Sequence, residues 1–294
     1  MFNPKRLAIA IAAGLALAAP AAPARAQALD RYFPAAGVHT VVLRVDEGLV
    51  HCGSGPLDDV HLLVHGSSHG LELRAMDVVL AQRVSHDTLE LTLKLRLSPN
   101  LPAIRATGMV ELGIPGDIRP AVELGIGDIE ARDLESGGRL EAAEGSIRVT
   151  GATGPLELRT VDGTAWARDV DGTLRAVTRD GQVDVAGRLD AVVAEARDGS
   201  LDIDASRGST APEGGGGGWL LRTRGGDIKL KLPKEFAGVL AARTGSGELD
   251  PGPYPVPPKA PGSPGEGGAS LRVLLGEGSG QIRVESESGD IRLR

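Results

Sequence analysis

The sequence predicts an all-β protein built as a β-solenoid, in which short strands form coils that stack on one another. Three observations predict it: a glycine recurs at a constant spacing, aliphatic and polar residues alternate after each of these glycines, and aromatic residues make up only 2% of the chain. The alternation has the period of two that is typical of a strand with one buried face. A narrow stack of coils buries small aliphatic side chains and leaves little room for rings.

The composition is that of a folded chain, and it argues against one class of partner, the nucleic acids. The chain has 294 residues, of which 41% are hydrophobic, so it can build a core. It also has 42 glycines and 19 prolines, which indicates frequent turns. The formal net charge of −7 and the few aromatic residues argue against a nucleic acid as partner.

Residues 1–26 have the pattern of a secretory signal peptide. Lys5 and Arg6 precede a run of Ala, Leu and Ile, and Ala24-Arg25-Ala26 is a small-x-small cleavage site, with cleavage expected near Ala26, before Gln27. Cleavage would remove three basic residues and no acidic one, which takes the formal charge from −7 to −10. We expect the mature chain to have no membrane span and to reside in the periplasm or cell envelope. Its single cysteine, Cys52, is expected to be buried, with an intermolecular disulfide as the alternative.

Residues 27–112 are expected to form irregular β coils that cap one end of the stack. Strands are predicted at Val38–Val45, Val60–Val64, Asp77–Val84 and Thr88–Leu97. A cap is needed because an open end exposes unpaired strand edges.

Residues 113–207 contain the regular repeats. Glycine stands at every eighteenth position of this region, at Gly127, Gly145, Gly163, Gly181 and Gly199. A second strand fills the later half of each repeat, as at Leu156/Leu158 and Leu174/Ala176. An antiparallel β-sandwich would show similar alternation and is the alternative fold, but a strict period is better explained by coils stacked in register.

Residues 219–294 return to the same pattern and are expected to form C-terminal coils. Residues 208–218 are glycine-rich and predict a flexible excursion. Residues 250–269 hold seven prolines and predict an exposed loop within the C-terminal region.

Several segments resemble a family of exported bacterial proteins of unknown function that carry the label "putative adhesin". Val38–Val45 resembles the opening strand of that family, and Asp87–Leu91 resembles a later one. Glu111–Pro115 and Leu124–Ile129 resemble its entry into the repeats, and Leu232–Phe236 resembles its late coils. The resemblance implies a right-handed, single-stranded β-helix and a cell-envelope setting. It supplies no catalytic residues.

Few residues have the pattern of a functional site, and no catalytic or cofactor-binding residue is predicted. On a strand, His61 and His65 would share one face, which makes them candidate metal ligands, although polar residues on an outer face are the alternative. Trp166 falls at an outward position between Ala165 and Ala167 and is a candidate for contact with a partner.

These observations favour a non-catalytic binding or scaffold module of the cell envelope, similar to an adhesin, with an envelope protein or a polysaccharide as partner. A carbohydrate-active enzyme on a β-helix is the first alternative, although no pair of carboxylates stands out. A structural spacer without a specific ligand is the second. The sequence does not indicate the oligomeric state.

Overall fold

The computed structural model describes residues 27–67, 76–97, 107–207, 218–255 and 268–294, which form 20 strands and no helix. The predicted signal peptide, nearly all of the Gly-rich excursion and the centre of the Pro-rich loop lie outside the described residues. In the described part of the chain, no helix is long and apolar enough to cross a membrane. The strands are β1 (Gln27–Pro34), β2 (Thr40–Gly55), β3 (Asp59–Ser67), β4 (Met76–Ser85), β5 (Thr88–Leu97), β6 (Thr107–Pro115), β7 (Arg119–Leu134), β8 (Gly138–Glu144), β9 (Ile147–Thr153), β10 (Leu156–Asp162), β11 (Ala165–Asp180), β12 (Val183–Ala196), β13 (Leu201–Asp204), β14 (Trp219–Thr223), β15 (Ile228–Lys231), β16 (Gly238–Thr244), β17 (Leu249–Asp250), β18 (Ala269–Leu275), β19 (Gly280–Ser286) and β20 (Ile291–Leu293).

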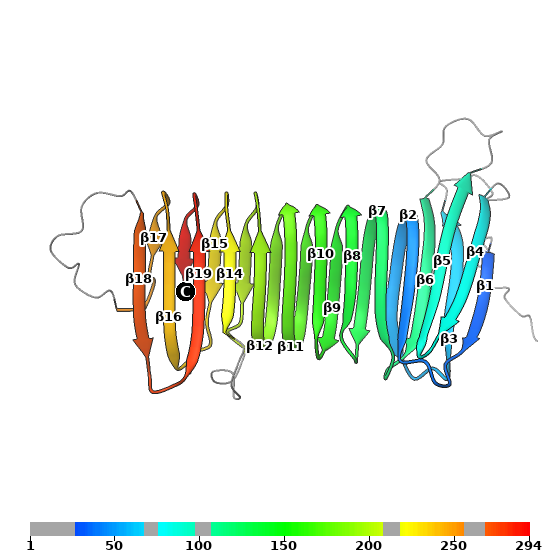
Figure 1. The fold of residues 1–294 in the computed structure, drawn as a ribbon, viewed down its shortest axis with the longest axis horizontal. Helices are drawn as coiled ribbons and strands as arrows, with labels where there is room; N and C mark the ends of the chain where they lie inside the picture. Colours follow the sequence, from blue (N-terminus) through cyan, green and yellow to red (C-terminus); the bar gives the residue numbers. More distant parts are fainter. Residues whose placement is uncertain (1–26, 68–75, 98–106, 208–217, 256–267) are drawn as a thin grey trace, which may run out of the picture.

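The strands lie side by side along the longest axis of the molecule, and they form two stacks that share the long strands (Figure 1). The first stack runs β4–β5–β2–β7–β8–β10–β11–β12–β14–β19–β16–β18. The second stack runs β1–β3–β6–β2–β7–β9–β11–β12–β13–β15–β20–β17. Strands β2, β7, β11 and β12 place one half in each stack.

Pairing in the repeat region is parallel and has the register that the sequence predicts. Leu156 of β10 pairs with Gly138 of β8 and with Leu174 of β11, one full repeat away on either side. All pairs from β7 to β15 in this region are parallel, so the antiparallel sandwich is not the arrangement found there. The four strands predicted in residues 38–97 are present as β2, β3, β4 and β5.

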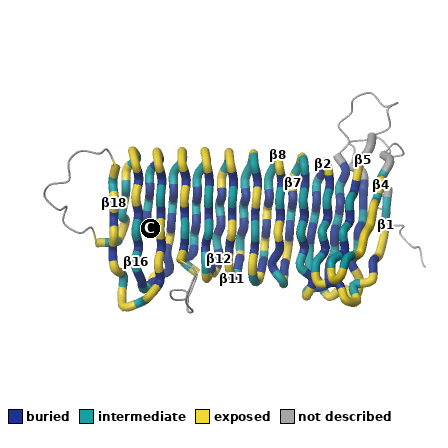
Figure 2. Tube along the Cα trace, in the orientation of Figure 1, coloured by how far each residue is buried: buried dark blue, intermediate teal, exposed yellow. Residues whose placement is uncertain are grey.

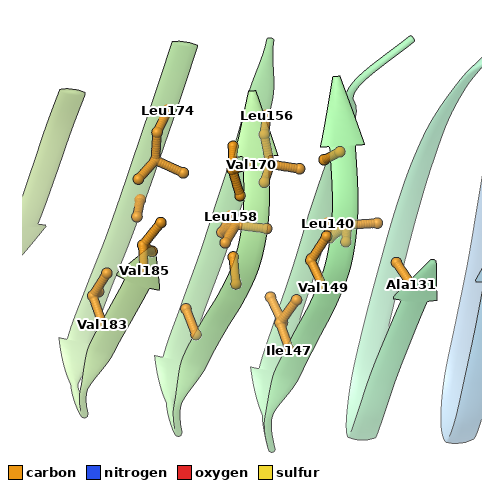
Figure 3. Packing of buried hydrophobic residues seen from close by; sticks show 14 of the residues in the cluster. Ala131, Leu140, Ile147, Val149, Leu156, Leu158, Val170, Leu174, Val183 and Val185 are labelled. Carbon is orange, nitrogen blue, oxygen red and sulfur yellow. The ribbon is translucent and has the colours of Figure 1, made fainter. Parts of the chain in front are cut away.

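Aliphatic side chains line the space between the two stacks. Buried and exposed residues alternate along each coil (Figure 2). Leu140, Leu158, Ala176 and Ala194 occupy one register position on neighbouring strands and are fully buried. Figure 3 shows such side chains pointing into the interior from successive coils. Each coil therefore buries its apolar face between the two stacks and against the coils on either side of it.

The recurring glycines form one column along the turns of the coils. A β-carbon added to any column member after Gly48 would lie 1.7 to 2.2 Å from the carbonyl oxygen of the preceding member. Its members, in spatial order, are Gly48, Gly127, Gly145, Gly163, Gly181, Gly199, Gly226, Gly289 and Gly247. From the sequence alone, the presence of glycine at these positions is explained by the turns of the chain. The structure adds a second reason for glycine, because neighbouring turns stack too closely to admit any side chain.

Buried hydroxyl groups satisfy carbonyls of this column. Thr244 is fully buried, and its hydroxyl donates to the carbonyl of Gly289 at 2.8 Å and accepts from the N–H of Gly247 at 2.9 Å. Thr223 donates to the carbonyl of Gly199 at 2.8 Å in the same way. The carbonyls of Gly199 and Gly289 are thus paired where they face the core.

At the N-terminal end, the chain order and the spatial order differ. Strand β2 pairs with β5 and β6 on one side and with β7 on the other, so strands β3 to β6 lie outside it although they follow it in the sequence. The outermost strands, β4 and β1, are antiparallel to their neighbours β5 and β3.

The C-terminal end has the same kind of reversal. Strand β19 lies between β14 and β16, and β20 lies between β15 and β17. Residues 280–293 are therefore inserted between two coils that precede them in the sequence. In Figure 1 the end of the chain lies within the stack beside β19, while β18 forms the outer edge.

Candidate functional site

An outward row of polar and aromatic side chains crosses the second stack. Its members occupy one register position on nine neighbouring strands, and all are partly or fully exposed. In spatial order they are His51, Glu130, Arg148, Trp166, Asp184, Asp202, Lys229, Arg292 and Asp250. We call this set the Trp166 row. Parallel strands stacked in register bring these residues side by side although they are far apart in the sequence.

The indole of Trp166 is held against two guanidinium groups. The guanidinium carbon of Arg168 lies 4.6 Å from the centre of the ring, and that of Arg148 lies 5.9 Å from it. Both distances fall within the range of a cation–π contact. Trp166 is partly exposed, as its outward position in the sequence predicts.

Arg168 is itself fixed to the sheet. Its guanidinium donates two hydrogen bonds of 2.8 Å to the carboxylate of Asp184 and one each to the main-chain carbonyls of Ala167 and Asp184. One terminal nitrogen of the guanidinium makes both carboxylate bonds and the other makes both main-chain bonds, so the group is held at two points. Because the group also bonds the backbone, it lies low on the sheet, and the indole rests against a rigid support.

One acidic member of the Trp166 row, Asp202, has a shifted pKa. Burial, and after it the negative charge of Asp184, raises the pKa of Asp202 above its ordinary value, although Lys229 opposes the shift. The Nζ atom of Lys229 lies 3.9 Å from a carboxylate oxygen of Asp202. In the row, the two neighbouring acids Asp184 and Asp202 thus lie between Trp166 and Lys229.

A signal for most of this row was present in the sequence. Glu130, Arg148, Trp166, Asp184 and Asp202 each stand three residues after a repeat glycine. The prediction singled out Trp166 alone and missed the two arginines that contact it. Arg168 lies two positions further along its strand, so it shares the outward face and was also within reach of the pattern.

His61 and His65 lie on the same strand, β3, but each contacts a different carboxylate. The Nε2 atom of His61 is 2.9 Å from Asp30, and its ring stacks on Tyr32 with centroids 4.3 Å apart. The Nε2 atom of His65 is 3.3 Å from Glu111. Among the residues that the structure describes, no group of three or more His, Cys, Asp or Glu side chains is placed to hold a metal ion.

Two further residues are turned into the core. Cys52 is buried, and burial raises the pKa of its thiol to about 12, so the reactive thiolate is suppressed at neutral pH. Trp219 is only 3% exposed, and its indole N–H donates to the carbonyl of Asp190 at 3.2 Å. Trp166 is therefore the tryptophan that is presented at the surface.

The chain is similar to solved structures of two bacterial proteins. One is a putative cell adhesion protein from Clostridium sporogenes, with 12% identity, a TM-score of 0.29, and coverage of 90% of this chain and 97% of that one. The other is a putative adhesin from Bacteroides fragilis, with 12% identity, a TM-score of 0.34, and coverage of 90% and 96%. One structure is described as a cell adhesion protein and the other as an adhesin, and the second description is also that of the family that the sequence resembles.

No protein-family model matches the chain. No curated protein matches it either.

Proposed function

We propose that the protein is an exported, non-catalytic binding module of the cell envelope, and that the Trp166 row is its contact surface. The scaffold would be a right-handed β-solenoid with 18-residue coils, capped by residues 27–112. Its partner would be an envelope protein or a polysaccharide. The observation that carries this proposal is the fixed position of Trp166 on a regular outer face, between Arg148 and Arg168.

Rigid aromatic and arginine side chains suit this task. Tryptophan and arginine are the residues that most often dominate binding energy at interfaces, because they offer large contact areas and directed polar groups. The hydrogen bonds that hold Arg168 remove much of the entropy that a free side chain loses on binding. The contact surface is therefore organised before a partner arrives.

The alternative of a carbohydrate-active enzyme finds less support in the geometry. Glycoside hydrolysis uses two carboxyl groups that face each other across the scissile bond. A cavity of about 990 Å³ near the C-terminal end of the stack is lined by a single acidic side chain, that of Glu235. On the Trp166 row, Asp184 is occupied by Arg168, so it is unsuited to act as a free acid or base.

The test is cosedimentation of the purified protein with isolated cell-envelope fractions. Saturable binding is expected, and Trp166→Ala should weaken it about 10-fold or more, since truncation of an anchoring tryptophan commonly costs that much. Tyr32→Ala is the matched control, because Tyr32 is an aromatic residue that is 64% exposed on β1, away from the row. Equal binding by the two variants would exclude the row as the contact surface, and an absence of saturable binding would favour the spacer.

Export is tested separately. The mature protein recovered from the envelope should begin at Gln27 when its N-terminus is sequenced. Recovery of the intact chain from the cytoplasm would contradict the proposed location.

A further inference from the structure

A cavity of about 990 Å³ opens at the C-terminal end of the second stack, where the regular coils give way to irregular turns. It is bounded by the residues that follow β13 and β15, the turn after β17 and the end of β18. Its volume lies at the upper end of the range for cavities that hold small ligands. It lies beyond the ends of the strands that carry the Trp166 row, so it is a separate place on the molecule.

The side chains that line the cavity are mainly positively charged, whereas the protein as a whole has a negative net charge. Four cationic side chains line the cavity, those of Arg207, Lys231, Lys234 and Arg294, against one acidic side chain, that of Glu235. The lining side chains therefore carry an excess of positive charge in a chain whose formal net charge is −7.

These four cations differ in how strongly they are already engaged. Arg207 contacts Asp169 at 2.7 Å, and Lys231 contacts Asp204 at 3.1 Å. Both pairs are largely exposed to solvent, so each is weak and leaves its cation accessible. For Lys234 and Arg294, no carboxylate side chain lies within ion-pair distance in the described ranges of the chain.

The other side of the cavity is apolar. Leu232 and Phe236 line it and are 4% and 8% exposed, so they form a fixed wall. A hydrogen bond of 3.1 Å from the N–H of Phe236 to the carbonyl of Pro233 closes the turn that presents the ring. Tyr254 adds an aromatic side chain, and its hydroxyl group donates to the main-chain carbonyl of Arg294 at 3.5 Å.

We infer that this cavity binds a small organic anion, namely a carboxylate or phosphate group carried on an aromatic or aliphatic body. The anionic group would lie among Lys234, Arg294 and Arg207, and the body would pack on Phe236 and Leu232. Cations with unfilled hydrogen-bonding capacity recognise such oxygens, and the apolar wall adds affinity that an inorganic ion does not gain. This inference is independent of the Trp166 row.

The inference is tested by calorimetric titration with three probes: phenyl phosphate, inorganic phosphate and phenol. Phenyl phosphate should bind more tightly than either of the others, because it alone engages both sides of the cavity. Raising the salt concentration should weaken its binding, since the cations are partly exposed and therefore screened. Inorganic phosphate that binds as tightly as phenyl phosphate would overturn the role of the apolar wall.

Lys234→Gln should lower the affinity for phenyl phosphate about 10-fold, the effect of losing one charge-assisted contact. Arg243→Gln is the matched control, since Arg243 is an exposed cation on β16 that does not line the cavity. Equal affinities in the two variants, or no binding of phenyl phosphate at millimolar concentration, would overturn the inference. The melting temperature of Lys234→Gln, measured alongside, should equal that of the unmodified protein.

Discussion

Replacing Gly163 with alanine tests the physical basis of the stack directly. The added β-carbon would lie 1.9 Å from the carbonyl oxygen of Gly145 and 2.7 Å from its carbonyl carbon. Real β-carbons do not approach other atoms to less than 3.0 Å. The two turns would therefore have to separate by about 1.1 Å, because the neighbouring atom is backbone and has no rotamer to change.

The cost follows from the hydrogen bonds that such a separation breaks. The N–H of Gly145 donates to the carbonyl of Asp162 at 2.9 Å, and that of Ile147 donates to the carbonyl of Thr164 at 2.8 Å. Losing two such bonds costs about 1–3 kcal/mol. The φ of +149° at Gly163 is unfavourable for alanine and adds about 1–3 kcal/mol. We expect a loss of about 2–6 kcal/mol in the free energy of unfolding.

Thermal unfolding monitored by circular dichroism measures this effect. A loss of that size should lower Tm by about 5–20 °C in a chain of this length. Gly55→Ala is the control, because no atom lies within 4 Å of its added β-carbon and its φ is not in the left-handed region. It should change the free energy of unfolding by about 0.5 kcal/mol or less. Equal melting temperatures for the two variants would refute the steric account of the glycine column.

Three further predictions concern buried and partly buried polar groups. Thr244→Val should cost about 1–3 kcal/mol, because it leaves the carbonyl of Gly289 and the N–H of Gly247 unpaired. Thr178→Val should be nearly neutral, since the buried Thr178 hydroxyl has no hydrogen-bond partner among the described residues. Equal denaturant midpoints for the two variants would contradict this. Burial, and after it the charge of Asp184, raises the pKa of Asp202 above its ordinary value of 3.8. Its contribution to stability therefore falls as the pH rises from 3.8 through the raised pKa, and Asp202→Asn should be more stable than the unmodified protein at neutral pH. Burial raises the pKa of Asp204, but hydrogen bonds from Ser206 and Lys231 outweigh it and lower the pKa, so Asp204→Asn should be less stable than the unmodified protein at neutral pH. The stability differences of both Asn variants should disappear in acid. Denaturant titrations at several pH values that show no such change would count against the two pKa shifts. Cys52 should resist iodoacetamide in the folded protein and react after unfolding, as mass spectrometry would show; rapid labelling of folded protein would mean that the thiol is not buried.

The regular part of the fold was predictable because the 18-residue period determines its turns, its buried face and the register of its strands. The evenly spaced glycines determine the turns, the alternation after each glycine determines the buried face, and the constant spacing determines the register of Leu156 on Leu174. The ends were less predictable. The strands at Ile282 and Ile291 have the same alternation as any other coil, so their pattern does not reveal which neighbours they pair with.

In the candidate site, the outward position of Trp166 was predictable, but the side chains that contact it were not. Trp166 was identified from alternation alone, but the contact with Arg168 depends on side-chain orientations that spacing does not determine. The cavity beside Lys234 and Phe236 had no sequence signal, because its lining comes from turns far apart in the chain that break the period.

The inserted position of residues 280–293 sets an order of events during folding. The coil formed by β16 and β17 is joined to the coil of β14 and β15 only through β19 and β20, so before these two strands are present β16 can pair with β18 but not with the rest of the stack. The C-terminal end of the stack therefore cannot grow coil by coil in the order of the sequence. Its completion waits for β19 and β20, so a chain that lacks these two strands should leave this end open to proteases.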